Sequence, residues 1–241
     1  MKFKTKDGTI LEGEPVEGLE PTPSEKVATT DYELMGDWED EAEEVLVTDK
    51  PEKKVFVNKK FADGSKFGKN CVFVNCIFGS DCRFGDGCEF DSGCKFGFGC
   101  EFGPGCKFGS NCKFGNECQF GSDCLFGPDC KFGSDCKFDC WCKFSSNCKF
   151  GNGCIFSEVC GFGSHCEFDD NCEFNSYCEL GSFCQFGSDC KFSSYCKFGF
   201  NCDFASDCEF GSGCRFSYRC KFGDNCKIAT PYWDDKGKHK E

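Results

Sequence analysis

The chain is poor in the features that mark membrane proteins, secreted proteins and many enzymes. Its 241 residues include only 2 His and 2 Met. No apolar run approaches the length of a membrane span, and no apolar core of a signal peptide follows Met1. No phosphate-binding loop, Ser-His-Asp set or paired-carboxylate motif is present. The composition therefore predicts a cytoplasmic, non-enzymatic protein without a cofactor or a bound metal.

Basic residues are also scarce. The chain has 28 Lys and Arg against 41 Asp and Glu, which gives a net charge of −13. Residues 1–60 hold 16 of these acidic residues and 9 of the basic ones. Because a negative protein repels nucleic-acid phosphate, we expect no nucleic-acid binding. The charge suits solubility or a basic protein partner.

Two residue types are abundant, with 28 Cys and 32 Phe. From Cys76 to Cys226 a Cys stands at every sixth position, and Phe follows two residues later except at Leu180 and Ile228. Upstream the pattern weakens, and one residue is missing between Cys71 and Cys76. A fixed period is the signature of a repeat architecture. Residues 55–228 are therefore predicted to form one solenoid.

Each hexad predicts a short strand followed by a turn. Side chains alternate along a strand, so Cys and Phe face inward and the charged residue between them faces outward. Gly or a turn-tolerant residue follows Phe, as at Gly109, Gly115 and Asp139, and this favours a corner that needs backbone freedom. Buried thiols then pack as small apolar groups. Disulfides between coils and metal binding remain as alternatives.

The hexads "CKFGSD" and "CKFGSN" resemble those of the hexapeptide-repeat proteins. The resemblance implies an all-β, left-handed parallel β-helix with three hexads per coil and about nine coils. At about 4.8 Å per coil, such a rod is roughly 40 Å long. Cys-x-Phe is also similar, more distantly, to the pentapeptide-repeat proteins, which form a right-handed square helix. The six-residue period favours the hexapeptide fold.

The two ends of the chain differ from the repeats. Residues 1–54 are predicted to be an acidic N-terminal arm, either partly disordered or docking on a partner. An Asp-Gly turn predicts a small hairpin over residues 3–11. Residues 229–241 are predicted to be a C-terminal cap and charged tail. In the acidic stretch 31–44, the apolar residues are the candidates for docking: Tyr32, Leu34, Met35 and Trp38. We expect this stretch to lie across a column of stacked lysines, formed by Lys95, Lys113, Lys131 and Lys149.

The outer surface offers three further candidate sites. Residues 18 apart should stack, and this places large apolar residues on one edge, at Trp141, Val159, Tyr177 and Tyr195. Such a row is typical of an interface, and a cluster near the next edge extends it, formed by Phe183, Phe200 and Tyr218. The remaining edge is acidic, with Asp81, Glu117, Asp135, Asp189 and Asp207. Cys140 breaks the rhythm of six and is predicted to be a solvent-facing, reactive thiol.

These features favour a rigid scaffold that binds a protein partner or self-associates into a homo-oligomer through the apolar row. The resemblance implies an alternative, an acyltransferase with His165 as its base. Against it, no loop interrupts residues 76–228, and one His on the repeats cannot supply a three-His zinc site. The third alternative is an acidic inhibitor that mimics nucleic acid toward a basic enzyme, by analogy with pentapeptide-repeat proteins.

Overall fold

The computed structural model describes residues 2–4, 10–12, 53–229 and 232–233. The chain divides into two compact units, Met1–Glu41 and Ala42–Glu241. In the first unit, strands β1 (Lys2–Lys4) and β2 (Ile10–Glu12) pair antiparallel, with Phe3 opposite Leu11. This pairing confirms the two strands of the predicted hairpin, whose Asp-Gly turn lies outside the described residues.

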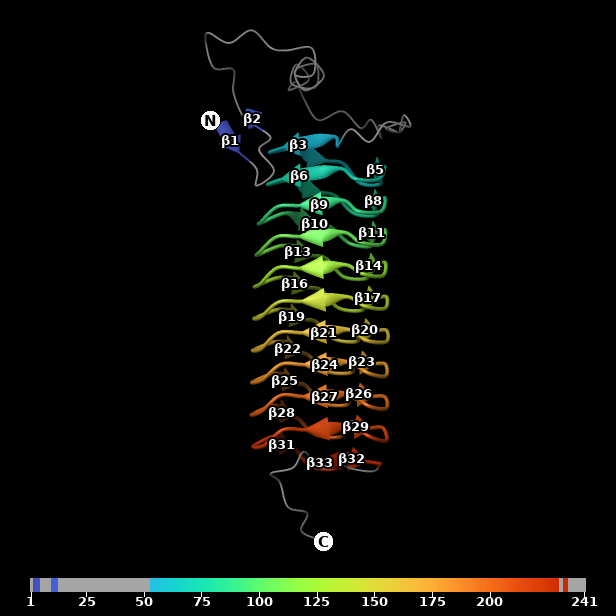
Figure 1. Cartoon of the computed structure of the whole chain (residues 1–241). Helices are drawn as coiled ribbons and strands as arrows, with labels where there is room; N and C mark the ends of the chain where they lie inside the picture. Colours follow the sequence, from blue (N-terminus) through green and yellow to red (C-terminus); the bar gives the residue numbers. More distant parts are fainter. Residues whose placement is uncertain (1, 5–9, 13–52, 230–231, 234–241) are drawn as a thin grey trace. The chain divides into compact units, whose positions relative to one another are not determined.

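The second unit is a parallel β-solenoid of about ten coils, with three strands in each coil (Figure 1). The described residues contain no helix. Each coil adds one strand to each of three parallel sheets. Sheet I has ten strands: β4 (Lys60–Phe61), β7 (Ile77–Phe78), β10 (Lys95–Phe96), β13 (Lys113–Phe114), β16 (Lys131–Phe132), β19 (Lys149–Phe150), β22 (Glu167–Phe168), β25 (Gln185–Phe186), β28 (Asp203–Phe204) and β31 (Lys221–Phe222).

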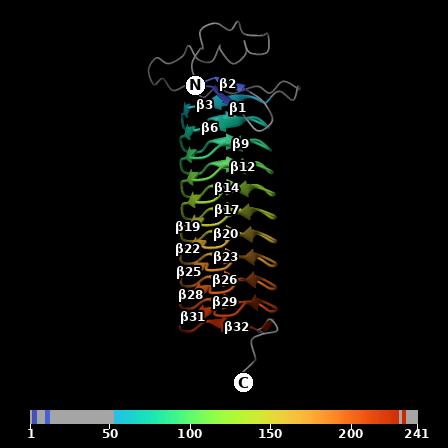
Figure 2. The same ribbon diagram turned by 60° about the vertical axis from the view of Figure 1, so that its left-hand side comes forward.

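Sheets II and III complete each three-stranded coil, and Figure 2 shows the stacked strands turned by 60°. Sheet II has ten strands: β5 (Lys66–Phe67), β8 (Arg83–Phe84), β11 (Glu101–Phe102), β14 (Gln119–Phe120), β17 (Lys137–Phe138), β20 (Ile155–Phe156), β23 (Glu173–Phe174), β26 (Lys191–Phe192), β29 (Glu209–Phe210) and β32 (Lys227–Ile228). Sheet III has eleven: β3 (Val55–Val57), β6 (Val72–Val74), β9 (Glu89–Phe90), β12 (Lys107–Phe108), β15 (Leu125–Phe126), β18 (Lys143–Phe144), β21 (Gly161–Phe162), β24 (Glu179–Leu180), β27 (Lys197–Phe198), β30 (Arg215–Phe216) and β33 (Tyr232–Trp233).

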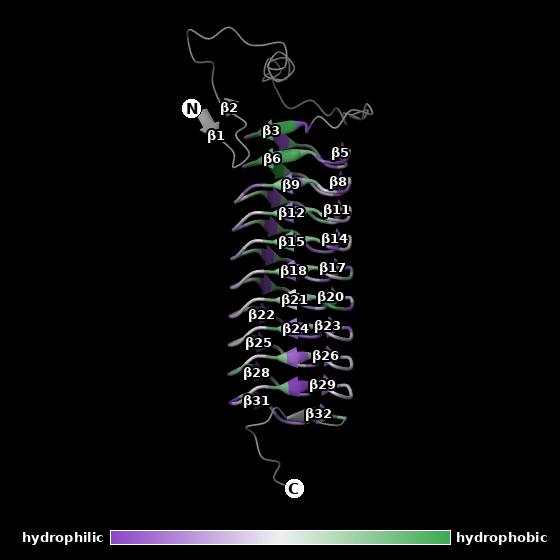
Figure 3. Ribbon diagram, in the orientation of Figure 1, coloured by the Kyte–Doolittle hydropathy of each residue, from purple (hydrophilic) through white to green (hydrophobic). Residues whose placement is uncertain are grey.

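The parallel solenoid with three hexads per coil is confirmed, and its left hand stays a prediction. The ladder is longer than the Cys repeat at both ends. β3 pairs with β6 and brings Phe56 opposite Phe73, while β33 pairs with β30 and brings Trp233 opposite Phe216. The first strands of sheet III, β3 and β6, are also its most apolar (Figure 3).

The residue missing before Cys76 shortens one corner of the coil. Partners in the first coils are 17 residues apart, as in Lys60 with Ile77, whereas partners within β7 to β32 are 18 apart, as in Lys95 with Lys113. Two shortened turns stack on each other, and Asn75 Nδ2 donates to Asn58 Oδ1 at 2.9 Å. The deletion is therefore absorbed by a matched pair of turns, and the strands stay in register.

Phenylalanine rings fill the interior. Rings one coil apart stack with their centroids 4.6–5.2 Å apart, between the closest pair Phe126–Phe144 and the widest pair Phe204–Phe222. Successive rings of one coil meet edge to face, as in Phe132 and Phe138 at 5.1 Å and 87°. Offset and edge-to-face contacts are the arrangements that aromatic quadrupoles favour. An aromatic interior thus fits a three-sided coil.

The thiols line the corners of this interior. From Cys94 to Cys226, each Cys of the six-residue series donates its Sγ–H to a backbone carbonyl 21 residues earlier, as in Cys100 to Gly79 O at 3.4 Å and Cys142 to Gly121 O at 3.4 Å. Among the described residues, backbone N–H groups leave these carbonyls unpaired, except those of Phe73 and Gly79. Cys therefore does more than fill space, because its weak S–H donor satisfies a buried acceptor. Ser65 occupies one such position and donates to Ala62 O.

Candidate interaction surfaces

Each corner of the coil contains a residue in the left-handed conformation, directly before the Cys position. Positive φ values occur there in every described turn, for example 60° at Asn111 and 70° at Gly105. A positive φ at the third residue is the geometry of a type II turn, and Pro104 in the second position fits it. The prediction that the residue after Phe needs this freedom is wrong. Glycine is favoured after Phe for a different cause, the close approach of neighbouring backbone. At Gly97 a Cβ would lie 2.6 Å from the carbonyl carbon of Gly79.

The acidic edge lies on the corner between sheets I and II. Its left-handed positions are nearly all Gly, Asn or Asp, the residues that adopt this conformation at the lowest cost. They are Gly64, Asp81, Gly99, Glu117, Asp135, Gly153, Asn171, Asp189, Asp207 and Asn225. In the described part of the chain no group of three or more His, Cys, Asp or Glu is arranged to hold a metal ion.

The predicted apolar row lies on the corner between sheets II and III. We call Trp141, Val159, Tyr177 and Tyr195 the aromatic ridge. All four residues have positive φ, between 61° and 66°. Trp141, Tyr177 and Tyr195 are 53%, 54% and 52% exposed. A β-branched or bulky residue with positive φ is an outlier that costs conformational free energy. The backbone conformation of the ridge therefore lowers the stability of the folded chain.

The ridge side chains lean along the solenoid axis. The rings of Tyr177 and Tyr195 stack with centroids 5.1 Å apart and planes 9° apart. A Cβ added at Gly213, in the next coil, would lie 2.6 Å from Tyr195 Cδ1. The ridge thus ends where glycine makes room for the last tyrosine.

A second aromatic row lies on the corner between sheets III and I. It comprises His165, Phe183, Phe200 and Tyr218, whose rings follow one another at 4.9, 4.9 and 5.5 Å. The prediction grouped Phe183, Phe200 and Tyr218, and the structure brings them together. It places them across sheet III from the ridge. Sequence reasoning missed His165 as a member, although its 18-residue spacing to Phe183 was visible.

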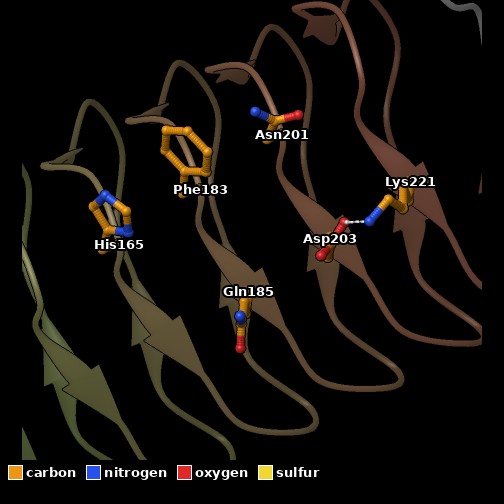
Figure 4. A pocket seen from close by; sticks show the side chains of 6 residues that line it. All are labelled: His165, Phe183, Gln185, Asn201, Asp203 and Lys221. Carbon is orange, nitrogen blue, oxygen red and sulfur yellow. Dashed lines mark ion pairs between the residues drawn. The ribbon is translucent and has the colours of Figure 1, made fainter.

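A shallow depression of about 340 Å³ adjoins this row (Figure 4). His165, Phe183 and Asn201 follow one another along its rim, while Gln185, Asp203 and Lys221 come from sheet I; Asp203 and Lys221 form an ion pair at 3.5 Å. The imidazole of His165 lies face to face with the Phe183 ring, with planes 3° apart. His165 is therefore part of an exposed aromatic stack.

The lysine column is present on sheet I. Lys95, Lys113, Lys131 and Lys149 are partners in one parallel ladder. Lys149 pairs with Glu167, whereas the other three make no ion pair within the described residues. The arm residues predicted to cover the column, Tyr32, Leu34, Met35 and Trp38, lie outside the described residues. Arm docking therefore stays a prediction.

Burial raises the pKa of several interior thiols, among them Cys76 and Cys94. The pKa of Cys94 rises to about 11, which keeps the thiol protonated at neutral pH. Cys140 is half-buried, as are Cys220 and Cys226 near the C-terminal end. Burial, together with the carboxylates of Asp139 and Glu158, raises the pKa of Cys140. Accessibility thus favours a reaction at Cys140, whereas its pKa opposes it, and the predicted reactivity stays a prediction.

Among known proteins, the RNA-binding, Nab2-type zinc finger family matches five segments of the chain, residues 75–91, 94–109, 106–121, 123–139 and 141–157. These segments cover less than half of the chain. The finger type takes three Cys and one His as zinc ligands, but the matched segments contain no His. Their repeat cysteines point into the core and donate to carbonyls. These residues do not fit a zinc site of that type.

No curated protein and no solved structure matches the chain. In the described residues, no helix is long and apolar enough to cross a membrane.

Proposed function

We propose that this protein is a non-enzymatic, rigid β-solenoid scaffold that binds a protein partner through the aromatic ridge, with self-association as its simplest form. One observation carries the proposal. Four successive left-handed positions on one corner hold Trp, Val, Tyr and Tyr, where Gly, Asn or Asp would cost less.

The structure of the free chain does not offset this cost by burial. Each such conformation costs on the order of 1–3 kcal/mol, while the three aromatic residues of the ridge stay about half exposed. Tyr and Trp are enriched in the energetic centres of protein interfaces, because they bury much area with little entropy loss. Contact with a partner would bury the ridge and supply the missing stabilisation.

The second aromatic row supports the same function. On the corner between sheets III and I, the early coils use Asn, Gly and Asp, from Asn58 to Asn147, and the departures begin at His165. On the ridge corner, residues other than Gly, Asn and Asp occupy the left-handed position over nearly the same coils, starting at Trp141. Both departures therefore border the same part of sheet III.

The rival functions gain less support. His165 belongs to an aromatic stack, so an interface role explains it without the acyltransferase. The acidic corner is explained by the residues that left-handed turns prefer, without mimicry of nucleic acid. The RNA binding of the matched family is not carried over, because the zinc ligands do not fit and a net charge of −13 opposes phosphate binding.

The test replaces Tyr177 and Tyr195 together by Asn, which suits a positive φ. We expect the association constant to fall at least tenfold, either for self-association, measured by light scattering, or for a partner captured from the host. The melting temperature should not fall by more than a few degrees. The matched control replaces Asp189 and Asp207 by Asn on the acidic corner, and it should bind as the wild type does. Unchanged mass and unchanged partner binding in the tyrosine variant would refute the proposal.

A further inference from the structure

Gly161 is an unexplained glycine at the centre of the face between the two aromatic rows. Among the two-residue strands of the solenoid, only β21 begins with glycine. Its ladder partners at this outward position are Lys143 and Glu179. Glycine weakens a strand, and it is typical of places where another molecule approaches the backbone. A Cβ built on Gly161 meets no heavy atom within 4 Å, so the fold itself does not require glycine.

The residues that flank Gly161 are raised. Along the chain, Val159 of the aromatic ridge lies two residues before it, and His165 of the second aromatic row lies four residues after it. Trp141 and Tyr177 on one side are 53% and 54% exposed, and Phe183 on the other side is 41% exposed. The β21 segment therefore forms a strip between two rows of bulky, partly exposed side chains, on the side of the solenoid that carries the labels β21, β24 and β27 in Figure 1.

The strip carries one positive charge that no ion pair neutralises within the described residues, on Lys143. Lys143 lies between Leu125 and Gly161 in the ladder, is exposed, and makes no ion pair in the described part of the chain. On the other side of Gly161, Glu179 is neutralised by Lys197 at 2.6 Å. A partner that reaches Gly161 therefore meets an unpaired ammonium group next to an apolar surface, because Leu125 is itself 41% exposed.

Resting on the interaction role above, we propose that this strip binds an amphipathic α-helix of another protein, with its apolar side over Gly161 and a carboxylate toward Lys143. The six residue steps from Val159 to His165 limit the spacing of the two rows to at most about 20 Å. A helix with its side chains, about 10–12 Å across, is narrower than this limit.

The first experiment measures the affinity of the full-length protein for synthetic helical peptides by fluorescence anisotropy. The probe is a peptide of about twelve residues, roughly 18 Å long as a helix, with Leu at i, i+3, i+4 and i+7. One version has Glu beside the Leu stripe and the other has Lys. We expect the Glu peptide to bind at least tenfold more tightly than the Lys peptide, and Lys143→Glu to reverse this order. Equal binding of the two peptides, or no binding of either, would overturn the proposal.

The second experiment replaces Gly161 by Thr. Threonine favours strands and its Cβ meets open space, so the melting temperature should stay or rise, while the affinity for the Glu peptide falls at least tenfold. Gln119→Thr is the matched control, because it occupies the same outward position on sheet II, and it should bind normally.

The outcomes separate this inference from the proposed function. If Gly161→Thr binds the Glu peptide normally while the double tyrosine variant loses its partner, the ridge is an interface but the helix site is wrong. If Gly161→Thr instead lowers the mass of a homo-oligomer, a second copy occupies the strip, and the helix proposal is also wrong.

Discussion

The acidic corner and the ridge corner are built from the same turn but filled by different rules. Asp135 and Trp141 lie six residues apart and have φ values of 59° and 66°. On the acidic corner, Asp and Asn are the residues that the backbone prefers, so its charge needs no functional cause. On the ridge corner, Trp, Val and Tyr oppose that preference. Under the proposed function, the interaction surface of this solenoid is marked by residues that the local backbone disfavours.

The largest expected effect tests whether both corners depend on one core. Phe138 lies on sheet II between the two corners and is 1% exposed. Phe138→Ala should cost about 3–5 kcal/mol of unfolding free energy, because it leaves a cavity in the ring stack. Chemical denaturation measures this value. The control Leu125→Ala, at a residue 41% exposed, should change it by less than about 0.5 kcal/mol. A small cost at Phe138 would mean that the corners hold the coils together.

The next prediction concerns a residue of the ridge type placed at a left-handed position of the acidic corner. Asn171 has a φ of 60°, so Asn171→Val places a β-branched residue in the left-handed region. We expect a loss of about 1–3 kcal/mol, measured by the same denaturation. Asn171→Gly is the control and should be close to neutral. If valine were accepted without loss, the ridge would carry no backbone cost and the comparison between the corners would fail.

The reverse exchange should stabilise the protein by a smaller amount. Val159 has a φ of 61°, and Val159→Asn relieves it while giving up some apolar contact. We expect a gain of about 1 kcal/mol, seen as a rise in the melting temperature, together with weaker partner binding. A lower melting temperature would show that Val159 is stabilised by its neighbours within the free chain.

Removing charge from the acidic corner should have a still smaller effect. Asp189 lies on the surface and makes no ion pair in the described residues. Asp189→Asn should change stability by less than about 0.5 kcal/mol, and the difference should shrink further in high salt. A change above about 1 kcal/mol would assign this carboxylate a structural role.

The smallest effect is on a reaction rate at the start of the ridge. Asp139 contributes to the raised pKa of Cys140, so Asp139→Asn should speed alkylation of Cys140 at neutral pH by a few fold, and the wild-type rate should rise with pH. Mass spectrometry after brief alkylation measures this. We expect Cys140, Cys220 and Cys226 to be modified before the other cysteines, because only these three are half-buried. Early modification of Cys94 would contradict the buried thiol ladder.

The repeat made the fold predictable. The spacing of Cys and Phe gives the six-residue repeat, and the resemblance to the hexapeptide-repeat proteins implies three repeats per coil; together they predict the stacking of Lys95 on Lys113 and of Tyr177 on Tyr195. The ends were less predictable. Phe56 lacks a Cys partner two residues before it, and its strand is recognised only through its pairing with β6.

The function of single positions was harder to predict. The residue after Phe and the residue before Cys are both rich in Gly, Asn and Asp, and only the φ values show which one is left-handed. Gly161 was missed because glycine is common in the chain, with 30 copies. Its meaning depends on its place in a strand, which composition does not reveal.

The uniform register has a consequence for the length of the molecule. From β7 to β32 the ladder partners lie 18 residues apart, and each coil bonds only to the coils beside it. The gain or loss of one such unit would lengthen or shorten the rod by about 4.8 Å and leave every other contact unchanged. Between the first coil and Trp141, the length along the axis therefore changes only in whole coils. A change in the number of coils would move the proposed binding face along the axis without altering its residues.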